Sequence, residues 1–249
     1  MSSVVFGIHA VFSQLEKSPD AVTEMLLQDN YIKNRKLSAI FQLAKDRGLK
    51  ISVVKRKQLD ELVNRANHQG VVMQVKSTQK QYSESDLDNI LENIEETPLL
   101  LILDQIQDPH NLGACLRTAA AAGAHAVIAP KDGAASITST VQKVACGATD
   151  ILPYVQVTNL ARTMKYLQKL GIWITGTSLN TEEYLYEIDF KGATAIVIGS
   201  EGGGMRRLVS ENCDYLAKIP MPGQMESLNA SVATGICLFE VVRQRTMSK

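Results

Sequence analysis

The stretch IPMPGQMESLNAS, residues 219–231, is followed at once by the helical pattern VATGICLFEVVRQR. It predicts a strand that ends near Ile219, an extended loop held by two prolines and a glycine, and a long amphipathic helix with Ser227 and Asn229 in its first turn. The first turn of a helix carries free N–H groups and the positive end of the dipole, and the extended loop leaves main-chain groups unpaired. The stretch therefore predicts a strand, loop and helix that together bind electron-rich ligand atoms.

Two earlier segments are built in the same way. DQIQDPHNLGACLRTA at 104–119 and IVIGSEGGGMRR at 196–207 each run from an apolar strand through a polar or glycine-rich loop into a helix. Strands are expected at 99–104, 126–130, 153–157, 172–176, 193–199 and 215–220, and helices at 111–123, 138–146, 159–170, after 205 and at 227–245. This alternation predicts an α/β fold with a parallel sheet that helices cover on both faces, and ligands bind such sheets at the carboxyl ends of the strands.

The N-terminal part of the chain predicts a smaller α/β unit. A helical pattern at about 7–17 precedes apolar strands near 21–27, 49–54 and 71–75, with helical stretches between them. The polar segment 77–86 lacks apolar periodicity, and an acidic helix is expected at 84–96. The predicted organisation is a first domain at 1–76, a linker with the leading acidic helix at 77–97, and a second domain at 98–249.

Composition excludes several classes of protein. The chain of 249 residues is 45% hydrophobic, yet its apolar runs are far shorter than the roughly 20 residues of a membrane-spanning helix. No signal peptide opens the sequence, so we expect a cytoplasmic protein. The four cysteines form no CxxC pair and the four histidines are scattered, so neither a disulfide framework nor a metal site is predicted. Cys115 and Cys237 lie in apolar helical patterns and are expected to be buried free thiols.

The zero net charge conceals a basic region. Residues 1–80 carry 13 Lys and Arg against 7 Asp and Glu, whereas residues 81–104 carry 7 acidic residues and no basic one. Within 31–57, nine basic residues accompany the single acid Asp46. This excess suits a surface that contacts nucleic acid, and a solvated helix face explains it equally well.

Each loop segment taken alone has an ordinary structural explanation. GSEGGG at 199–204 fits neither the dinucleotide nor the phosphate-loop spacing, and a tight turn accounts for its glycines but not for the charged Glu201. Asn111, like Ser227 and Asn229, suits a helix cap. Arg117 lies in the Ala-rich stretch CLRTAAAAGA, where a guanidinium needs an anionic partner.

Together the three segments resemble the three ordered motifs of the SpoU (TrmH-like) class of the SPOUT superfamily, which are RNA ribose 2′-O-methyltransferases. The first motif is NLGACLR at 111–117, the second is IGSEGGGM at 198–205, and the third is IPMPGQMESLNAS. The stretches GIHAV at 7–11 and HQGV at 68–71 resemble the L30e-like RNA-binding domain of the subgroup that methylates a guanosine in bacterial 23S rRNA. The departures are small, since only Ala230 and Cys146 differ from residues common in the subgroup.

The resemblance implies a fold and a cofactor. It implies a deep trefoil knot in the second domain and S-adenosylmethionine bound in the knot, largely by main-chain groups. Carried onto this chain, the cofactor-binding residues are Thr177, Gly199, Ile219, Met221 and Leu228.

The resemblance also implies the roles of other residues. Arg117 occupies the catalytic position, where it binds the target phosphate or hydroxyl; Asn111, Glu201, Ser227 and Asn229 orient it and the nucleotide, with Glu201 holding the guanidinium. The resemblance implies that the protein binds 23S rRNA or a precursor of the large ribosomal subunit. It also implies a homodimer, because active sites of this class use residues from both protomers. The expected RNA-binding residues of the first domain are Lys33, Arg35, Lys36, Lys55 and Arg56.

Three other functions are compatible with parts of the pattern. A tRNA ribose 2′-O-methyltransferase uses the same chemistry, although many such enzymes have only short terminal extensions. A catalytically silent RNA-binding assembly factor is disfavoured by the intact polar residues of the motifs. A nucleotide-dependent oxidoreductase is disfavoured by the glycine spacing and its late position in the chain.

Overall fold

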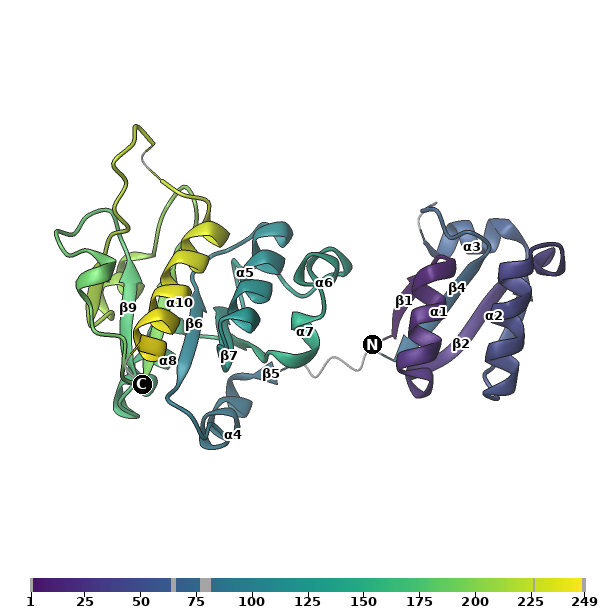
Figure 1. Cartoon of the computed structure of the whole chain (residues 1–249), viewed down its shortest axis with the longest axis horizontal. Coiled ribbons are helices and arrows are strands. Elements are labelled where there is room, and N and C mark those ends of the chain that lie inside the picture. Colours follow the sequence, from purple (N-terminus) through teal and green to yellow (C-terminus); the bar gives the residue numbers. More distant parts are fainter. Residues whose placement is uncertain (1, 64–65, 77–81, 226, 248–249) are drawn as a thin grey trace. The chain divides into compact units, whose positions relative to one another are not determined.

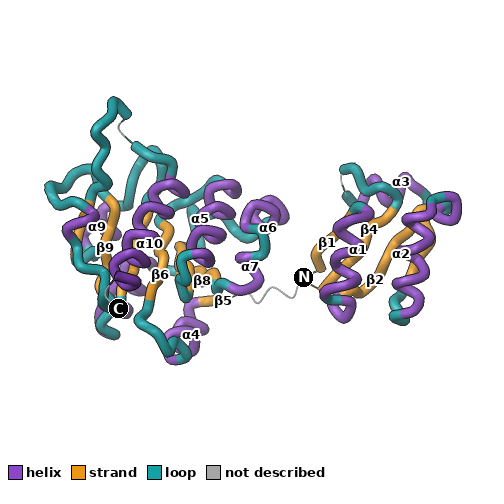
Figure 2. Tube along the Cα trace, in the orientation of Figure 1, coloured by secondary structure: helices purple, strands orange, loops and turns teal. Residues whose placement is uncertain are grey.

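The computed structural model describes residues 2–63, 66–76, 82–225 and 227–247. The chain forms two compact units, Met1–Gln79 and Lys80–Lys249 (Figures 1 and 2). No helix in the described part of the chain is long and apolar enough to cross a membrane.

The first unit is a four-stranded sheet with helices. Its strands are β1 (Ser2–Phe6), β2 (Val22–Gln28), β3 (Ile51–Val54) and β4 (Val71–Lys76), in the order β1-β4-β2-β3. Its α-helices are α1 (Ile8–Lys17), α2 (Arg35–Asp46) and α3 (Arg56–Leu62), and short 3-10 turns lie at Pro19–Ala21 and Tyr31–Lys33. Only β2 and β3 are parallel. The strand β1 lies outside the predicted elements, because SSVVF is too short to show a period.

The second unit contains a sheet of seven strands, all of whose pairings are parallel, as predicted. Its strands are β5 (Tyr82–Ser83), β6 (Leu99–Leu103), β7 (Ala126–Pro130), β8 (Tyr154–Val157), β9 (Trp173–Thr177), β10 (Thr194–Ile198) and β11 (Tyr215–Ala217), in the order β11-β9-β10-β6-β7-β8-β5. Its α-helices are α4 (Leu87–Glu92), α5 (Pro109–Ala121), α6 (Ser139–Ala145), α7 (Ala148–Ile151), α8 (Leu160–Lys169), α9 (Arg207–Glu211) and α10 (Ala230–Met247), with 3-10 turns at Glu84–Asp86 and Leu185–Glu187.

Helices cover both faces of this sheet. Alternate residues of β6 enter different cores: Leu101 packs in the cluster that includes residues of α5, α6 and α10, and Leu100 packs in the cluster that includes residues of α8 and α9. Every residue of β6, β7 and β10 is buried. A strand buried on both faces needs apolar side chains at every position, which explains the continuous apolar runs of the sequence.

The strand order places the loops of interest together. The chain builds one half of the sheet with β6, β7 and β8 and then continues with β9, β10 and β11 on the other side of β6. The order therefore reverses between β6 and β10, where Ile198 lies opposite Leu103. Open α/β sheets bind ligands at such a point, outside the carboxyl ends of the strands. The deep knot stays a prediction, because strand order does not define how a chain threads through a loop.

Three predicted boundaries are wrong. α10 begins at Ala230, so Ser227 lies in the preceding loop and Asn229 is the cap, whose Oδ1 accepts a hydrogen bond from Ser231 N at 2.9 Å. β11 ends at Ala217, because the next residue pairs with the segment around Tyr184 instead of with the sheet. The acidic helix is limited to a 3-10 turn and α4, which ends at Glu92.

The four cysteines are free thiols that differ in burial. Cys115 and Cys237 are buried, which confirms the prediction, Cys213 is half-buried and Cys146 is exposed. Burial raises the pKa of Cys115 to about 11 and the pKa values of Cys213 and Cys237 to about 12. At pH 8 these three groups remain protonated thiols, and the thiolate is the reactive form.

Iodoacetamide at pH 8 is therefore expected to label Cys146 in the folded chain and the other three cysteines only after unfolding. Mass spectrometry of peptides, before and after addition of denaturant, measures the labelled fraction at each site. Rapid labelling of Cys237 without denaturant would show that the core around α10 opens easily, contrary to the packing seen here.

Candidate active site

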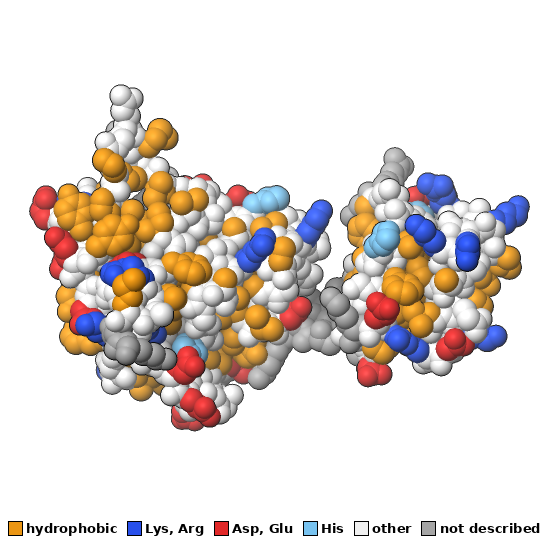
Figure 3. All heavy atoms as spheres, viewed as in Figure 1, with side chains coloured by type: hydrophobic (Ala, Val, Ile, Leu, Met, Phe, Trp, Pro, Cys, Tyr) orange, Lys and Arg blue, Asp and Glu red, His pale blue; other side chains and the backbone are white. Residues whose placement is uncertain are grey.

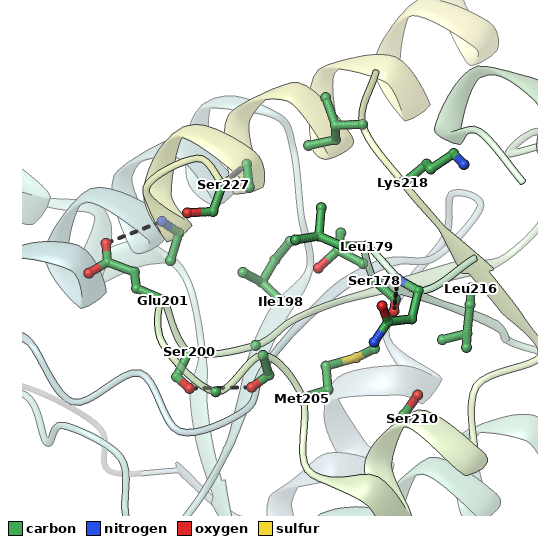
Figure 4. Close-up of a pocket in the computed structure, with 18 of the residues that line it drawn as sticks. Ser178, Leu179, Ile198, Ser200, Glu201, Met205, Ser210, Leu216, Lys218 and Ser227 are labelled. Carbon is green, nitrogen blue, oxygen red and sulfur yellow. Dashed lines mark hydrogen bonds between the residues drawn. The ribbon is translucent and has the colours of Figure 1, made fainter. Parts of the chain in front are cut away.

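The carboxyl ends of β11, β9 and β10 border a cavity of about 650 Å³. The last residue of each strand, Ala217, Thr177 and Ile198, lines it, as do Ala230 and Ala233 of α10. The volume lies within the roughly 300 to 1,000 Å³ of small-molecule sites. Figure 4 shows Glu201 and Ser227 near one end of the cavity, and Lys218 and Leu216 further along it.

The loop after β10 folds back on itself. Ser200 N donates to Gly204 O at 3.0 Å, and Gly204 N donates to Ser200 O at 2.9 Å. A Cβ on Gly199 would overlap the backbone of Gly204 and Met205, and Gly204 has a φ of +63°, so both positions require glycine. A tight turn therefore explains these glycines, and it holds Glu201 at the edge of the cavity.

An ion pair between a buried aspartate and an exposed arginine anchors this loop at its far end. Asp104 directly follows β6 and is fully buried, and its carboxylate accepts hydrogen bonds from Arg206 N at 2.7 Å and Arg206 Nε at 2.8 Å. Arg206 Nη2 lies 2.7 Å from the same carboxylate. Asp104 N donates to Ile198 O at 2.8 Å, so the pair joins the ends of β6 and β10 to the end of the loop. Sequence reasoning missed both residues, although a charged residue directly after the apolar run LLLIL is a usable signal.

Three segments meet at the Glu201 carboxylate. Asn111 Nδ2 donates to Glu201 Oε1 at 2.9 Å, and Asn229 Nδ2 donates to the same oxygen and, at 2.9 Å, to Asn111 Oδ1. Ala230 N, at the start of α10, lies 3.4 Å from Glu201 Oε1, and Figure 4 shows Glu201 directed toward this helix. A carboxylate at a helix N-terminus is stabilised by the dipole. The structure thus assembles Asn111, Glu201 and Asn229 into one hydrogen-bonded group.

Asn111 does not cap its helix, so that prediction is wrong. The cap is Asp108, whose Oδ1 accepts from His110 N at 2.9 Å, and Pro109 occupies the first helical position. Because the Asp108 side chain already accepts a hydrogen bond from the free N–H of His110, the Asn111 amide can bond to Glu201 and Asn229.

Small residues let α5 approach its neighbours closely. A Cβ on Gly113 would lie 2.7 Å from Val144 Cβ, in α6, so this glycine is required by helix packing. On the other side, Cys115 Sγ lies 3.3 Å from Thr234 Oγ1, in α10. This close packing of α5 and α10, which Figure 1 draws side by side, sets the start of one helix beside the start of the other.

The five residues expected to bind a cofactor all line the 650 Å³ cavity, as does Ser227: Thr177, Gly199, Ile219, Met221 and Leu228. Among the described residues, the main-chain groups of 219–225 enter no hydrogen bond. The cavity therefore combines apolar side chains with unpaired main-chain donors and acceptors. Sequence reasoning did not single out Lys218, whose side chain also lines the cavity and lies 3.4 Å from Glu182 Oε2.

Arg117 is separate from this group. It is exposed on α5, lines neither of the two cavities described for this unit, and forms no ion pair with any residue that the structure describes. The expected pairing of Glu201 with Arg117 is therefore not formed within the single chain. Within the chain, Glu201 Oε1 instead accepts from two asparagine amides and lies 3.4 Å from Ala230 N.

The basic residues of the first unit follow two neighbouring strand ends. β2 and β3 are parallel, with Gln28 opposite Val54, and Asp29 N donates to Val54 O at 2.9 Å. The segments that leave these strands therefore start at the same edge of the sheet. The five residues expected to bind RNA lie on these segments and are exposed: Lys33, Arg35, Lys36, Lys55 and Arg56. Figure 3 shows several Lys and Arg side chains at the end of this unit that carries α3.

Acidic, histidine and cysteine side chains do not gather into a metal site. Within 2–63, 66–76, 82–225 and 227–247, no three of them lie close enough together to hold a metal ion.

Comparison with protein families gives two matches along the chain. A family model described as the SpoU rRNA Methylase family matches residues 98–239. A second model, described as RNA 2′-O ribose methyltransferase substrate binding, matches residues 4–81.

Curated proteins and solved structures resemble the whole chain. It is 53% identical over 244 residues to the 23S rRNA (guanosine-2′-O-)-methyltransferase RlmB of Photobacterium profundum, with 98% of each chain covered. It is 49% identical over 246 residues to RlmB of Escherichia coli K12, covering 99% of this chain and 100% of that one. The SpoU methyltransferase AviRb of Streptomyces viridochromogenes, solved with AdoMet, has a TM-score of 0.72 and 25% identity, and the match covers 99% of this chain and 91% of AviRb.

Proposed function

The chain belongs to the SpoU rRNA methylase family, and from this premise we propose that it transfers a methyl group from S-adenosylmethionine to the ribose 2′-hydroxyl of a guanosine in 23S rRNA. The observation that carries the proposal is the meeting of a small-molecule cavity with the Asn111, Glu201 and Asn229 group at the carboxyl ends of the strands. RlmB proteins about half identical to this chain over its full length bear the name of this activity.

The cavity suits the methyl donor. The unpaired main chain of 219–225 can hydrogen-bond an adenine edge, and apolar side chains such as Ile198, Met205 and Leu228 can contact the faces of the adenine and the aliphatic part of the methionine chain. Gly199 has no side chain, so a ligand can closely approach the backbone at the end of β10. When bound, S-adenosylmethionine supplies an activated methyl group on a positively charged sulfur.

The reaction needs alignment more than activation of the donor. The ribose oxygen forms a bond to the methyl carbon while the carbon–sulfur bond breaks, the sulfur keeps the electron pair, and the hydroxyl proton is released to solvent. Alignment of two reactants supplies up to roughly 7 to 11 kcal/mol of the barrier. We assign this role to Asn111, Glu201, Ser227 and Asn229, which line or adjoin the cavity. We assign to the Arg117 guanidinium the stabilisation of the negative charge that develops on the oxygen.

We infer that Arg117 acts across a homodimer. Within one chain it is exposed and lines neither cavity, so a second copy is needed to bring its guanidinium to a methyl-transfer site. α10 also leaves Val232 and Phe239, seven residues apart on one helix face, each 49% exposed. An apolar face of this kind suits an interface between copies of the chain. Because the proposed substrate is ribosomal RNA, we place the enzyme in the cytoplasm.

Methyl transfer to defined RNAs tests the proposed function. The chain is incubated with cofactor labelled in the methyl group and with rRNA or tRNA from a strain that lacks the activity, and the modified ribose is then mapped. We expect label on one guanosine of 23S rRNA, or of a precursor particle of the large subunit. Label confined to tRNA, label on a base, or binding of rRNA without transfer would refute the proposal.

The first unit is proposed to bind the RNA backbone. Replacing Lys55 and Arg56 together by glutamine is expected to weaken RNA binding and to reduce the slope of log K against log salt by about 1 for each phosphate that the variant no longer neutralises. A matched control replaces Lys45 and Arg47 by glutamine. These two exposed basic residues lie at the C-terminal end of α2. Titrations of an rRNA fragment at several salt concentrations measure both slopes. Equal slopes in the two double variants would contradict the proposal that RNA binds at the edge of the sheet where Lys55 and Arg56 lie.

A further inference from the structure

A second cavity adjoins the first. It has a volume of about 250 Å³ and shares Ser200 and Glu201 with the larger cavity; Gln105, Gln107, Asp108 and Asn111 contribute its other polar lining. We propose that this cavity holds the guanine base of the target nucleotide and that the Asp108 carboxylate reads its Watson–Crick edge. The inference rests on the proposed function and names the substrate subsite of that reaction.

The position of the cavity follows from the chemistry. The target hydroxyl must approach a methyl group held in the larger cavity, and Glu201 borders both spaces. A ribose at this boundary has its base and its 3′ and 5′ phosphates to place. The smaller cavity is next to this position, and its volume is below the roughly 300 Å³ of sites for whole drug-sized ligands and suits one part of a nucleotide.

Charge favours the base over the phosphate. The lining holds two carboxylates, those of Asp108 and Glu201, and no described lysine or arginine lines it. A phosphate oxygen near these groups meets like charge without a counter-ion. A neutral base instead offers N–H groups that donate hydrogen bonds to carboxylates, and a carbonyl oxygen that accepts a hydrogen bond from a side-chain amide. The side chains of Gln105 and Gln107 form no hydrogen bond with the described residues, so both are available for this contact.

The donor pattern selects guanine. Asp108 Oδ1 accepts from His110 N, whereas Oδ2 has no hydrogen bond to any described residue. An ionised carboxylate has about four acceptor positions. Guanine is the RNA base whose Watson–Crick edge presents two neighbouring donors, N1–H and the 2-amino group, beside a carbonyl. Adenine and cytosine place a donor next to an acceptor, and uracil has one donor between two carbonyls. RNA bases taken out of the stack are commonly read on this edge.

The loop that carries these groups is held in place. Asp108 is fixed as the cap of α5, and Ile106 O accepts from Ala135 N at 2.8 Å. Asp104, at the start of the loop, is locked to Arg206. A site held by such contacts loses little entropy when it binds a base.

The test replaces one carboxylate oxygen of Asp108 by an amide nitrogen. Asp108→Asn keeps the cap, since asparagine caps helices as well as aspartate does, but exchanges an acceptor for a donor. The control is Asp189→Asn, because Asp189 is exposed, accepts from Lys191 N in the same local geometry, and lines neither cavity. Single-turnover methyl transfer is measured on rRNA fragments with guanosine or inosine at the target position, and inosine lacks the 2-amino group. Affinity for S-adenosylmethionine is measured by calorimetry.

We expect wild type to prefer guanosine over inosine. Asp108→Asn is expected to lose about 10- to 100-fold in kcat/KM on guanosine, to lose the preference, and to bind S-adenosylmethionine normally. Equal rates of wild type on the two substrates, or an Asp108→Asn variant that matches the Asp189→Asn control, would overturn the inference alone. A wild-type chain that methylates no rRNA refutes the proposed function and, with it, this inference. If Asp108→Asn fails to fold, the wild-type comparison of guanosine with inosine decides.

Discussion

Replacing Arg117 by alanine is expected to lower kcat for methyl transfer by about 10²- to 10³-fold, the usual cost of removing one group that stabilises developing charge. The protein itself should tolerate the change, because Arg117 is exposed and forms no ion pair with the described residues. Affinity for S-adenosylmethionine should also be unchanged, since the residue does not line the larger cavity. Single-turnover kinetics and calorimetry measure these two quantities separately.

Mixed dimers show whether Arg117 acts across the interface. An Arg117→Ala chain is mixed with a Glu201→Gln chain, each inactive alone, and the subunits are exchanged. If the guanidinium serves the partner's site, each mixed dimer has one site without a substitution, and random mixing restores about a quarter of wild-type activity. No recovery would place Arg117 and Glu201 in the same chain's site. Near-normal methyl transfer by the Arg117→Ala variant alone would show that Arg117 takes no part in catalysis.

Replacing Arg206 by alanine is expected to destabilise the second unit by on the order of 2 kcal/mol, because it leaves a buried carboxylate without its counter-ion. The effect is smaller than for a pair buried on both sides, because the Arg206 side chain is 42% exposed and solvent screens the pair. Asp104 is fully buried, and Arg206 supplies its counter-charge through Nε and Nη2, so after the substitution only the main-chain N–H of residue 206 remains among these donors. Trp173 is the only tryptophan of the chain and lies in β9, so its fluorescence during urea unfolding reports on this unit.

Two further variants separate charge from packing in this experiment. Asp104→Asn combined with Arg206→Ala removes the buried charge as well as its partner, and it should be more stable than Arg206→Ala alone. Glu211→Ala breaks the exposed pair with Arg207, whose charged atoms lie 3.4 Å apart, and should cost no more than about 1 kcal/mol. An Arg206→Ala variant as stable as Glu211→Ala would mean that the pair of Asp104 with Arg206 contributes little to the stability of the fold.

Several features of the fold could be predicted because they depend on local pattern. A strand buried on both faces needs apolar residues at every position, and a helix start needs a capping side chain, so β6, β7 and β10 and the helices between them were expected from the sequence. Boundaries were less predictable. Asp108 and Asn229 proved to be the caps of α5 and α10, whereas Asn111 and Ser227, which have equally suitable side chains, were not. Several nearby residues can cap a helix, and packing decides which one does.

The sequence by itself determined the order of the strands from β6 to β11, the three loops that follow strand ends, and the family to which the chain belongs. It did not predict the short strand β5 or the short helix α7. The tertiary structure alone decided which side chains meet. Asn111 bonds to Glu201, 90 residues away, and Asp104 pairs with Arg206, 102 residues away. Such contacts depend on the register of parallel strands and on the close approach of α5 to α10, which no local pattern encodes. For the same reason the separation of Arg117 from Glu201 within one chain became visible only in the folded structure.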